Sequence, residues 1–162
     1  MIIRNSSFVG GIAGWRPVNY ASNVRAAVVA DASARSAGHL LRVSTTRGGG
    51  SVAFDLNTNE AVTVSGWAGN QPISALGSFD ELSFGALAWV RASPGSAASS
   101  GSLAMWQLPQ PNQNTSARWN AGSDWSLVTC SHDFVSGGTT LRIEFYLDNP
   151  GRSLDIDSVL IF

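Results

Sequence analysis

Apolar and polar residues alternate along most of this 162-residue chain, and this period of two restricts the fold more than any other feature of the sequence. In the clearest run, residues 141–148, apolar residues take every second position and Arg142, Glu144 and Tyr146 lie between them. Because successive side chains of a β-strand point to opposite faces, this run predicts a half-buried strand. Comparable runs lie at residues 40–45, 52–56, 62–67, 84–91, 103–108, 125–134 and 154–161.

Turn-forming residues separate these runs. Gly, Pro, Asn and Ser cluster at positions 47–50, 69–72, 93–96, 136–138 and 148–151. About eight to ten short strands with such spacing predict one all-β domain over residues 1–162, an antiparallel two-sheet β-sandwich. The Ala-rich segment 24–37 fits either a helix or a strand followed by a loop, and the sequence leaves both open.

The charge balance restricts the partners. Charged residues make up 13% of the chain, well below the roughly 25% of an average domain. The net charge is −1, so we expect no nucleic-acid partner. A surface built mainly of neutral polar residues suits a sugar or a protein partner. No run approaches the about 20 apolar residues of a transmembrane helix, and we expect no membrane insertion.

The residues that catalysis requires are sparse. The chain has three glutamates and two well-separated histidines, and it lacks the Gly-rich and nucleophile-elbow motifs of common enzyme classes. Asp155 and Asp157 could point to one face of a strand, as glycosidase carboxylates must. We interpret them instead as a turn or a cation site. The sequence therefore predicts a protein that is not an enzyme.

Four segments resemble, in order, the motifs of jelly-roll carbohydrate-binding modules of the kind grouped around families 4, 9 and 22. They are Asn5–Trp15 with its Gly-rich turn, Leu40–Ser44 followed by Arg47, Ala88-Trp89-Val90-Arg91, and Leu154-Asp155-Ile156-Asp157-Ser158-Val159. The resemblance spans nearly the whole chain. It implies a jelly-roll topology and a non-catalytic domain that binds carbohydrate.

The resemblance also implies a structural calcium ion, which in the family ties the N-terminal segment to an Asp of the last strand. Asp157 matches that Asp, whereas Val9 stands where the family often has Glu. Backbone carbonyls could complete a shell of oxygen ligands. Calcium at Asp157 is thus an expectation, and no other cofactor is expected.

Combining the alternation with the motif positions predicts a core and a binding surface. The expected core comprises Phe8, Trp15, Leu41, Val43, Phe54, Val64, Val90, Trp125, Leu141, Ile143, Phe145 and Ile156. Aromatic rings and amides bind sugars without charge. The expected binding surface comprises Trp67, Trp89, Trp106, Gln107, Asn112, Asn114, Trp119, Arg142, Glu144 and Tyr146.

Each part of this surface has an alternative interpretation. Trp67, Trp89 and Trp106 lie opposite the expected core residues of their strands, which places them on the outer face of one sheet unless the two faces are inverted. Trp119 lies in the long polar stretch 109–124 and is the best candidate for an exposed ring. The polar side of residues 142–146 could equally be an ordinary solvated face.

Two functions fit these features. The first is a domain that recognises a glycan through exposed aromatic residues. The second is a structural virion protein, such as a bacteriophage capsid decoration or tail component, that uses the same sandwich for protein–protein or host-surface attachment. The first is the function we expect, and the second is the alternative. Two features point to the alternative: no signal peptide is seen after Met1, and no catalytic domain is attached. The expected location is extracellular or in a virion, the expected partners are a glycan or virion proteins, and a homo-oligomer is left open.

Overall fold

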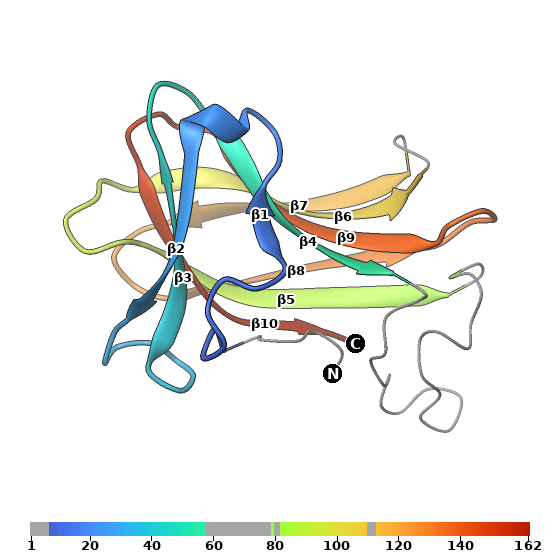
Figure 1. Ribbon diagram of the computed structural model, residues 1–162, viewed down its shortest axis with the longest axis horizontal. Helices are drawn as coiled ribbons and strands as arrows, with labels where there is room; N and C mark the ends of the chain where they lie inside the picture. Colours follow the sequence, from blue (N-terminus) through green and yellow to red (C-terminus); the bar gives the residue numbers. More distant parts are fainter. Residues whose placement is uncertain (1–6, 58–78, 80–81, 110–112) are drawn as a thin grey trace.

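Two five-stranded antiparallel sheets pack face to face in the computed structural model, which describes residues 7–57, 79, 82–109 and 113–162 (Figure 1). Sheet A has the order β1 (Trp15–Pro17), β4 (Gly50–Asn57), β9 (Thr140–Leu147), β6 (Ser99–Leu108) and β7 (Asn114–Ala121). Sheet B has the order β2 (Val24–Ala30), β3 (His39–Thr45), β10 (Ser153–Ile161), β5 (Ser83–Ala92) and β8 (Ser126–Asp133). The predicted all-β two-sheet sandwich is confirmed.

The strands with the clearest alternation occupy the centres of the sheets. β9 pairs with β4 on one side and with β6 on the other, and β10 pairs in the same way with β3 and β5. The Ala-rich segment contains β2, which pairs with β3 along its whole length, and a loop that follows it. A single short 3₁₀ turn, η1 (Ala21–Asn23), joins β1 to β2, and the described residues contain no helix long and apolar enough to cross a membrane.

The core lies between the two sheets. One group of rings surrounds Trp15, whose centroid lies 5.6–5.9 Å from those of Phe8, Phe54 and Phe145. A second group of rings, which comes from other segments of the chain, consists of Phe79, Phe84 and Phe134 in edge-to-face contact. Every expected core residue that the structure describes is buried except Trp125, and Val64 lies outside the described residues.

Trp125 was expected in the core but lies outside sheet B. It stands just before β8, so its ring covers the outer surface of the sheet and stacks on the guanidinium of Arg91 at 4.4 Å. Its indole N–H donates a hydrogen bond to the Ser33 carbonyl at 3.1 Å. The residue therefore fastens the loop between β2 and β3 to sheet B.

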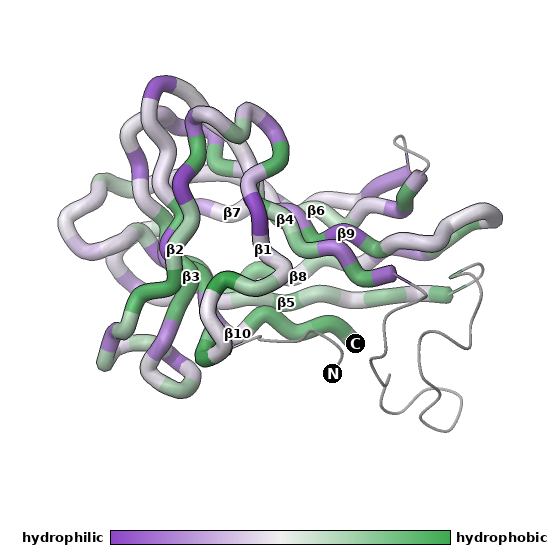
Figure 2. The backbone as a smooth tube through the Cα atoms, viewed as in Figure 1, coloured by the Kyte–Doolittle hydropathy of each residue, from purple (hydrophilic) through white to green (hydrophobic). Residues whose placement is uncertain are grey.

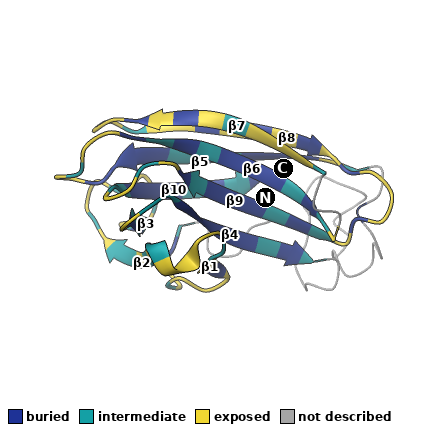
Figure 3. Ribbon diagram, turned by 90° about the horizontal axis from the view of Figure 1, so that it is seen from above, coloured by how far each residue is buried: buried dark blue, intermediate teal, exposed yellow. Residues whose placement is uncertain are grey.

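The outer faces are more covered than strict alternation suggests. Figure 2 shows hydrophilic and hydrophobic residues alternating along β4 and β9. Figure 3 nevertheless shows that β5, β6, β9 and β10 are largely buried, whereas exposed residues gather on the edge strands β7 and β8 and in the loops. Outward-facing residues of the central strands, such as Ala53 and Ala104, are small and sheltered by their neighbours.

Candidate functional site

The outer face of sheet A brings together polar residues from four strands. The register places Trp106 of β6 opposite Arg142 of β9, and Arg142 opposite Asp55 of β4. Asn114 of β7 lies on the far side of Trp106. Tyr146 follows Arg142 by four positions on β9 and points to the same face of sheet A. Arg142 and Tyr146 are thus half-buried on the same face as the half-buried Trp106 ring. Glu144, which was predicted on the binding surface, is buried between them instead.

The charged side chains of this face neutralise one another. The Nε and NH2 groups of Arg142 donate to the two carboxylate oxygens of Asp55 at 2.7 and 3.0 Å, and Arg16 donates to the same carboxylate at 2.5 Å. Burial acts to raise the pKa of Asp55, but the hydrogen bonds from Arg142 and Arg16 outweigh it, so the pKa lies below its ordinary value. At the other end of the face, Arg118 pairs with Asp148 at 2.6 Å.

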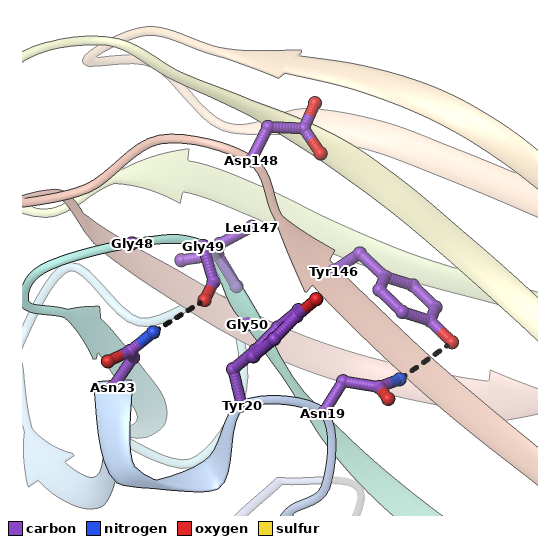
Figure 4. A pocket seen from close by; sticks show the side chains of 9 residues that line it. All are labelled: Asn19, Tyr20, Asn23, Gly48, Gly49, Gly50, Tyr146, Leu147 and Asp148. Atoms are coloured by element: carbon purple, nitrogen blue, oxygen red, sulfur yellow. Dashed lines mark hydrogen bonds between the residues drawn. The ribbon is translucent and has the colours of Figure 1, made fainter.

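A cavity of about 540 Å³ opens beside this face (Figure 4). It lies between the loop that joins β1 to η1, the turn between β3 and β4, and the end of β9. Its lining residues are Asn19, Tyr20, Asn23, Gly48, Gly49, Gly50, Tyr146, Leu147 and Asp148.

Hydrogen bonds hold one wall of this cavity. The side-chain amide of Asn19 donates to Glu144 Oε1 at 2.9 Å and to the Tyr146 hydroxyl at 3.2 Å. Ser51 also donates to Glu144, which is 1% exposed. Burial and then the Glu144 carboxylate raise the pKa of Tyr146, so its phenol stays protonated at neutral pH. The Tyr146 ring is therefore a fixed, uncharged surface.

Tyr20 is the lining residue that is least expected from the sequence pattern. It is 76% exposed and belongs to no alternating run. The available signal was an aromatic residue in a short polar segment, Asn19-Tyr20-Ala21-Ser22-Asn23, where neither strand nor core accounts for it.

Trp119 is not the exposed ring that the sequence predicted. Its segment is not a loop but strand β7, and the alternation of that strand turns Trp119 inward, where it is 4% exposed. The ring lies over Gly101 of β6, where a Cβ atom would clash with it. Asn114, at the start of the same strand, is exposed as expected.

The predicted tryptophans do not share one sheet. Trp89 lies on β5 of sheet B, where the Arg35 guanidinium stacks on its ring at 3.7 Å, so it is not on the face that carries Trp106. Gln107 is fully buried, and its amide exchanges two hydrogen bonds with the backbone of Val135 at 2.7 and 2.8 Å. Trp67 and Asn112 lie outside the described residues.

Asp157 uses its carboxylate to hold the loop before β3. Ser36 donates to it through its backbone N–H at 2.9 Å and its hydroxyl at 2.5 Å, and the N–H of Ser158 donates at 2.6 Å. Within the described ranges, no group of three or more His, Cys, Asp or Glu side chains could hold a metal ion. Calcium at Asp157 stays a prediction.

Replacing Asp157 by alanine should cost about 1–3 kcal/mol of unfolding free energy even in EDTA, because the partly buried donors of Ser36 and Ser158 lose their acceptor. If calcium binds here, EDTA will also lower the melting temperature of the parent, and the variant will have lost that sensitivity. Thermal melts of both proteins, with and without EDTA, measure both effects. A variant as stable as the parent in EDTA would contradict the tethering role.

Neither a protein-family model nor a curated protein matches the sequence. Several solved structures match the fold. The module TmCBM61, solved in complex with β-1,4-galactotriose, is 11% identical, with a TM-score of 0.61 over 99% of this chain and 96% of that one. The tandem CBM22-1–CBM22-2 domain of Xyn10C from Paenibacillus barcinonensis is 14% identical, with a TM-score of 0.70 over 99% of this chain and 44% of that one.

A third match comes from a virus. The enzymatically active domain of tailspike protein 4 of bacteriophage CBA120 is 11% identical, with a TM-score of 0.65 over 98% of this chain and 21% of that one. Identities this low establish likeness of fold alone. This chain therefore has the two-sheet β-sandwich fold that carbohydrate-binding modules share.

Proposed function

We propose that this domain is a non-catalytic module that binds a neutral glycan on the outer face of sheet A. The observation that carries the proposal is the arrangement of that face, where the half-buried Trp106, Arg142 and Tyr146 point to the same side and a cavity lined by Tyr146 opens at one end. A pyranose ring has an apolar face and a rim of hydroxyls. Aromatic rings and fixed polar groups match those two surfaces.

The charges of the face favour a neutral ligand. Arg16 and Arg142 are both paired with Asp55, and Arg118 is paired with Asp148. No arginine lines the cavity among the described residues. An acidic sugar would have to compete with these carboxylates for a guanidinium, whereas a neutral hydroxyl can accept or donate without breaking an ion pair.

The carboxylates of the face also support a binding role rather than catalysis. A general acid needs a proton at neutral pH, but the pKa of Asp55 is lowered by its two arginines. Glu144 is buried beneath the side chains of Asn19 and Ser51, both of which donate to the same oxygen. Both groups are engaged in holding the surface together. The fold likeness to modules solved with galactotriose or named as xylan-binding supports a carbohydrate ligand.

Titration of the purified protein with neutral polysaccharides such as galactan and xylan tests the proposal. We expect dissociation constants of roughly micromolar to millimolar and a change in Trp fluorescence. Trp106→Ala should weaken binding at least about tenfold, a loss of about 1.4 kcal/mol, because it removes the tryptophan ring from the proposed binding face. Isothermal titration calorimetry measures the loss.

Trp89→Ala is the matched control, because it removes a half-buried tryptophan from the outer face of the other sheet. It should leave glycan affinity unchanged. An equal loss in both variants, with folding intact, would place the site elsewhere. Absence of binding to the whole neutral panel would overturn the proposal.

A second candidate is a virion component, and the specific observation that favours it is the fold likeness to the bacteriophage tailspike. Such a protein would be found in the virion rather than free outside the cell, and its partners would be virion proteins. The two functions are compatible, since an attachment protein can bind a host glycan. Self-association without any glycan response, through an interface of at least about 1,000 Å², would favour the structural role.

A further inference from the structure

Tyr20 occupies a backbone conformation that tyrosine disfavours. Its φ and ψ angles are both 47°, in the left-handed region, where a Cβ atom crowds the following carbonyl. Glycine and asparagine are the usual residues there. The side chain forms no cap hydrogen bond with η1, and the residue is 76% exposed. Neither backbone preference nor core packing therefore accounts for a tyrosine at this position.

The surroundings impose this conformation without using the tyrosine ring. The backbone N–H of Asn19 donates to the Ser51 hydroxyl at 3.0 Å, and the N–H of Ser51 donates to the Asn19 carbonyl at 3.1 Å. The N–H of Asn23 donates to the Tyr20 carbonyl at 2.8 Å. At Gly50 a Cβ atom would lie 2.9 Å from the Asn19 carbonyl, so glycine is what allows the loop to lie this close to β4.

The ring that results from this arrangement borders the cavity. Figure 4 shows Tyr20 and Tyr146 on the same cavity, one from the β1–η1 loop and the other from β9, with the Asn19 amide bonded to the Tyr146 hydroxyl. Asn23 and Asp148 contribute polar groups to the same lining. Strained residues that the surroundings hold in place are typical of ligand clamps.

We infer that Tyr20 is a specificity-determining residue, a ring fixed in advance that holds one sugar of a neutral glycan against Tyr146 in the cavity. The inference rests on the proposed function and adds to it the place where the glycan is gripped. Because the loop is already ordered, binding does not have to order it, and that saving in entropy strengthens the complex. The strained backbone conformation of Tyr20 is retained because it places the tyrosine ring at the border of the cavity.

The test uses two effects of one substitution that should have opposite signs. Relief of the backbone strain should raise the melting temperature, and loss of the ring should lower the glycan affinity. Tyr20→Gly should raise the melting temperature by about 2–4 °C, because glycine adopts the left-handed region freely and the lost ring is mostly exposed. The same variant should bind neutral glycan at least about tenfold more weakly. Tyr20→Phe, which keeps the ring, should retain most of the affinity.

Ala37→Gly is the matched control. Ala37 is also an exposed non-glycine residue in the left-handed region, with φ 46°, but it lies in the loop before β3 and does not line the cavity. Its replacement should raise the melting temperature similarly and leave glycan affinity unchanged. Differential scanning calorimetry and calorimetric titration supply the two readouts for all four proteins.

The outcomes separate this inference from the proposed function. If the parent binds glycan and Tyr20→Gly binds it equally well, the clamp is overturned while the proposed function stands. A fall in the melting temperature of Tyr20→Gly would also overturn it, because Tyr20 would then be a packing residue. If the parent binds no glycan, the proposed function fails and the inference fails with it.

Discussion

Replacing Asp155 by alanine is expected to lower the free energy of unfolding by about 3–5 kcal/mol. Asp155 lies on the outer face of sheet B and is 0% exposed. Arg42 donates to its two oxygens at 2.7 and 3.0 Å, Arg91 donates at 3.1 and 3.2 Å, and the Ser93 hydroxyl donates at 2.6 Å. Alanine would leave two guanidinium groups at this site without their shared carboxylate.

The remaining neighbours cannot compensate for this loss. Asp31 lies 3.0 Å from Arg91 but 3.9 Å from Arg42, so one carboxylate would face both cations. The hydrogen bond from Arg42 to Asp155 raises the pKa of Arg42 in the parent, so that guanidinium gains from the carboxylate that the variant removes. Arg91 is only 7% exposed, so water has little access to its guanidinium. Truncating one member of a buried ion network is costly because the charges left behind stay desolvated.

Guanidinium denaturation of three variants measures this effect. Asp155→Asn keeps the shape and removes the charge, and it should lose most of the same stability. Arg118→Ala breaks an exposed pair with Asp148, whose side chains are 63% and 39% exposed, and should cost less than about 1 kcal/mol. An Asp155→Ala loss no larger than that of Arg118→Ala would mean that water screens the network.

Replacing Phe145 by alanine should also cost about 3–5 kcal/mol of unfolding free energy, through the loss of buried surface and the cavity left behind. Phe145 is 0% exposed at the centre of β9, with Val52 and Leu103 as its partners on the neighbouring strands. Its ring lies 5.9 Å from that of Trp15. The side chains beside Phe145 come from β4 and β6, which are both hydrogen-bonded to β9, so they cannot easily move into the cavity that alanine would leave.

Leu127→Ala is the control for this truncation, because Leu127 is 50% exposed on the edge strand β8. It should change stability by no more than about 0.5 kcal/mol. Equilibrium denaturation of both variants gives the comparison. A loss below about 1 kcal/mol for Phe145→Ala would mean that the two faces of β9 are reversed.

The two outer faces of the sandwich have different roles. On sheet B, the loop that follows β2 covers the Asp155 network, and Trp125 fastens that loop through Arg91 and Ser33. On sheet A, the polar row of Arg142 and Asp55 leads to an open cavity. Among the described residues, the cavity beside Tyr146 leaves space for a ligand on that side. This asymmetry explains why the proposed site lies on sheet A.

The strands and most of the core could be predicted from the amino-acid sequence, because the period of a strand is a local property. Alternation placed Leu141, Ile143 and Phe145 inside and put Arg142, Glu144 and Tyr146 on the opposite side of the same strand. These assignments required only neighbouring residues. Among the expected core residues that the structure describes, only Trp125 lies elsewhere, because it stands in the turn before a strand, where alternation gives no direction. Trp119 in turn joins the core although the sequence predicted an exposed ring.

Which strands share a sheet and which loops meet became known only from the folded structure. Trp89 and Trp106 look alike in the sequence, yet one lies on sheet B and the other on sheet A. The cavity joins Asn19 to Tyr146 across 127 residues, and no local pattern encodes a contact of that range. Tyr20 likewise became a candidate binding residue only when the structure showed which segments meet at the cavity. Its strained backbone is set by hydrogen bonds to a distant strand, and those exist only once the sheets have formed.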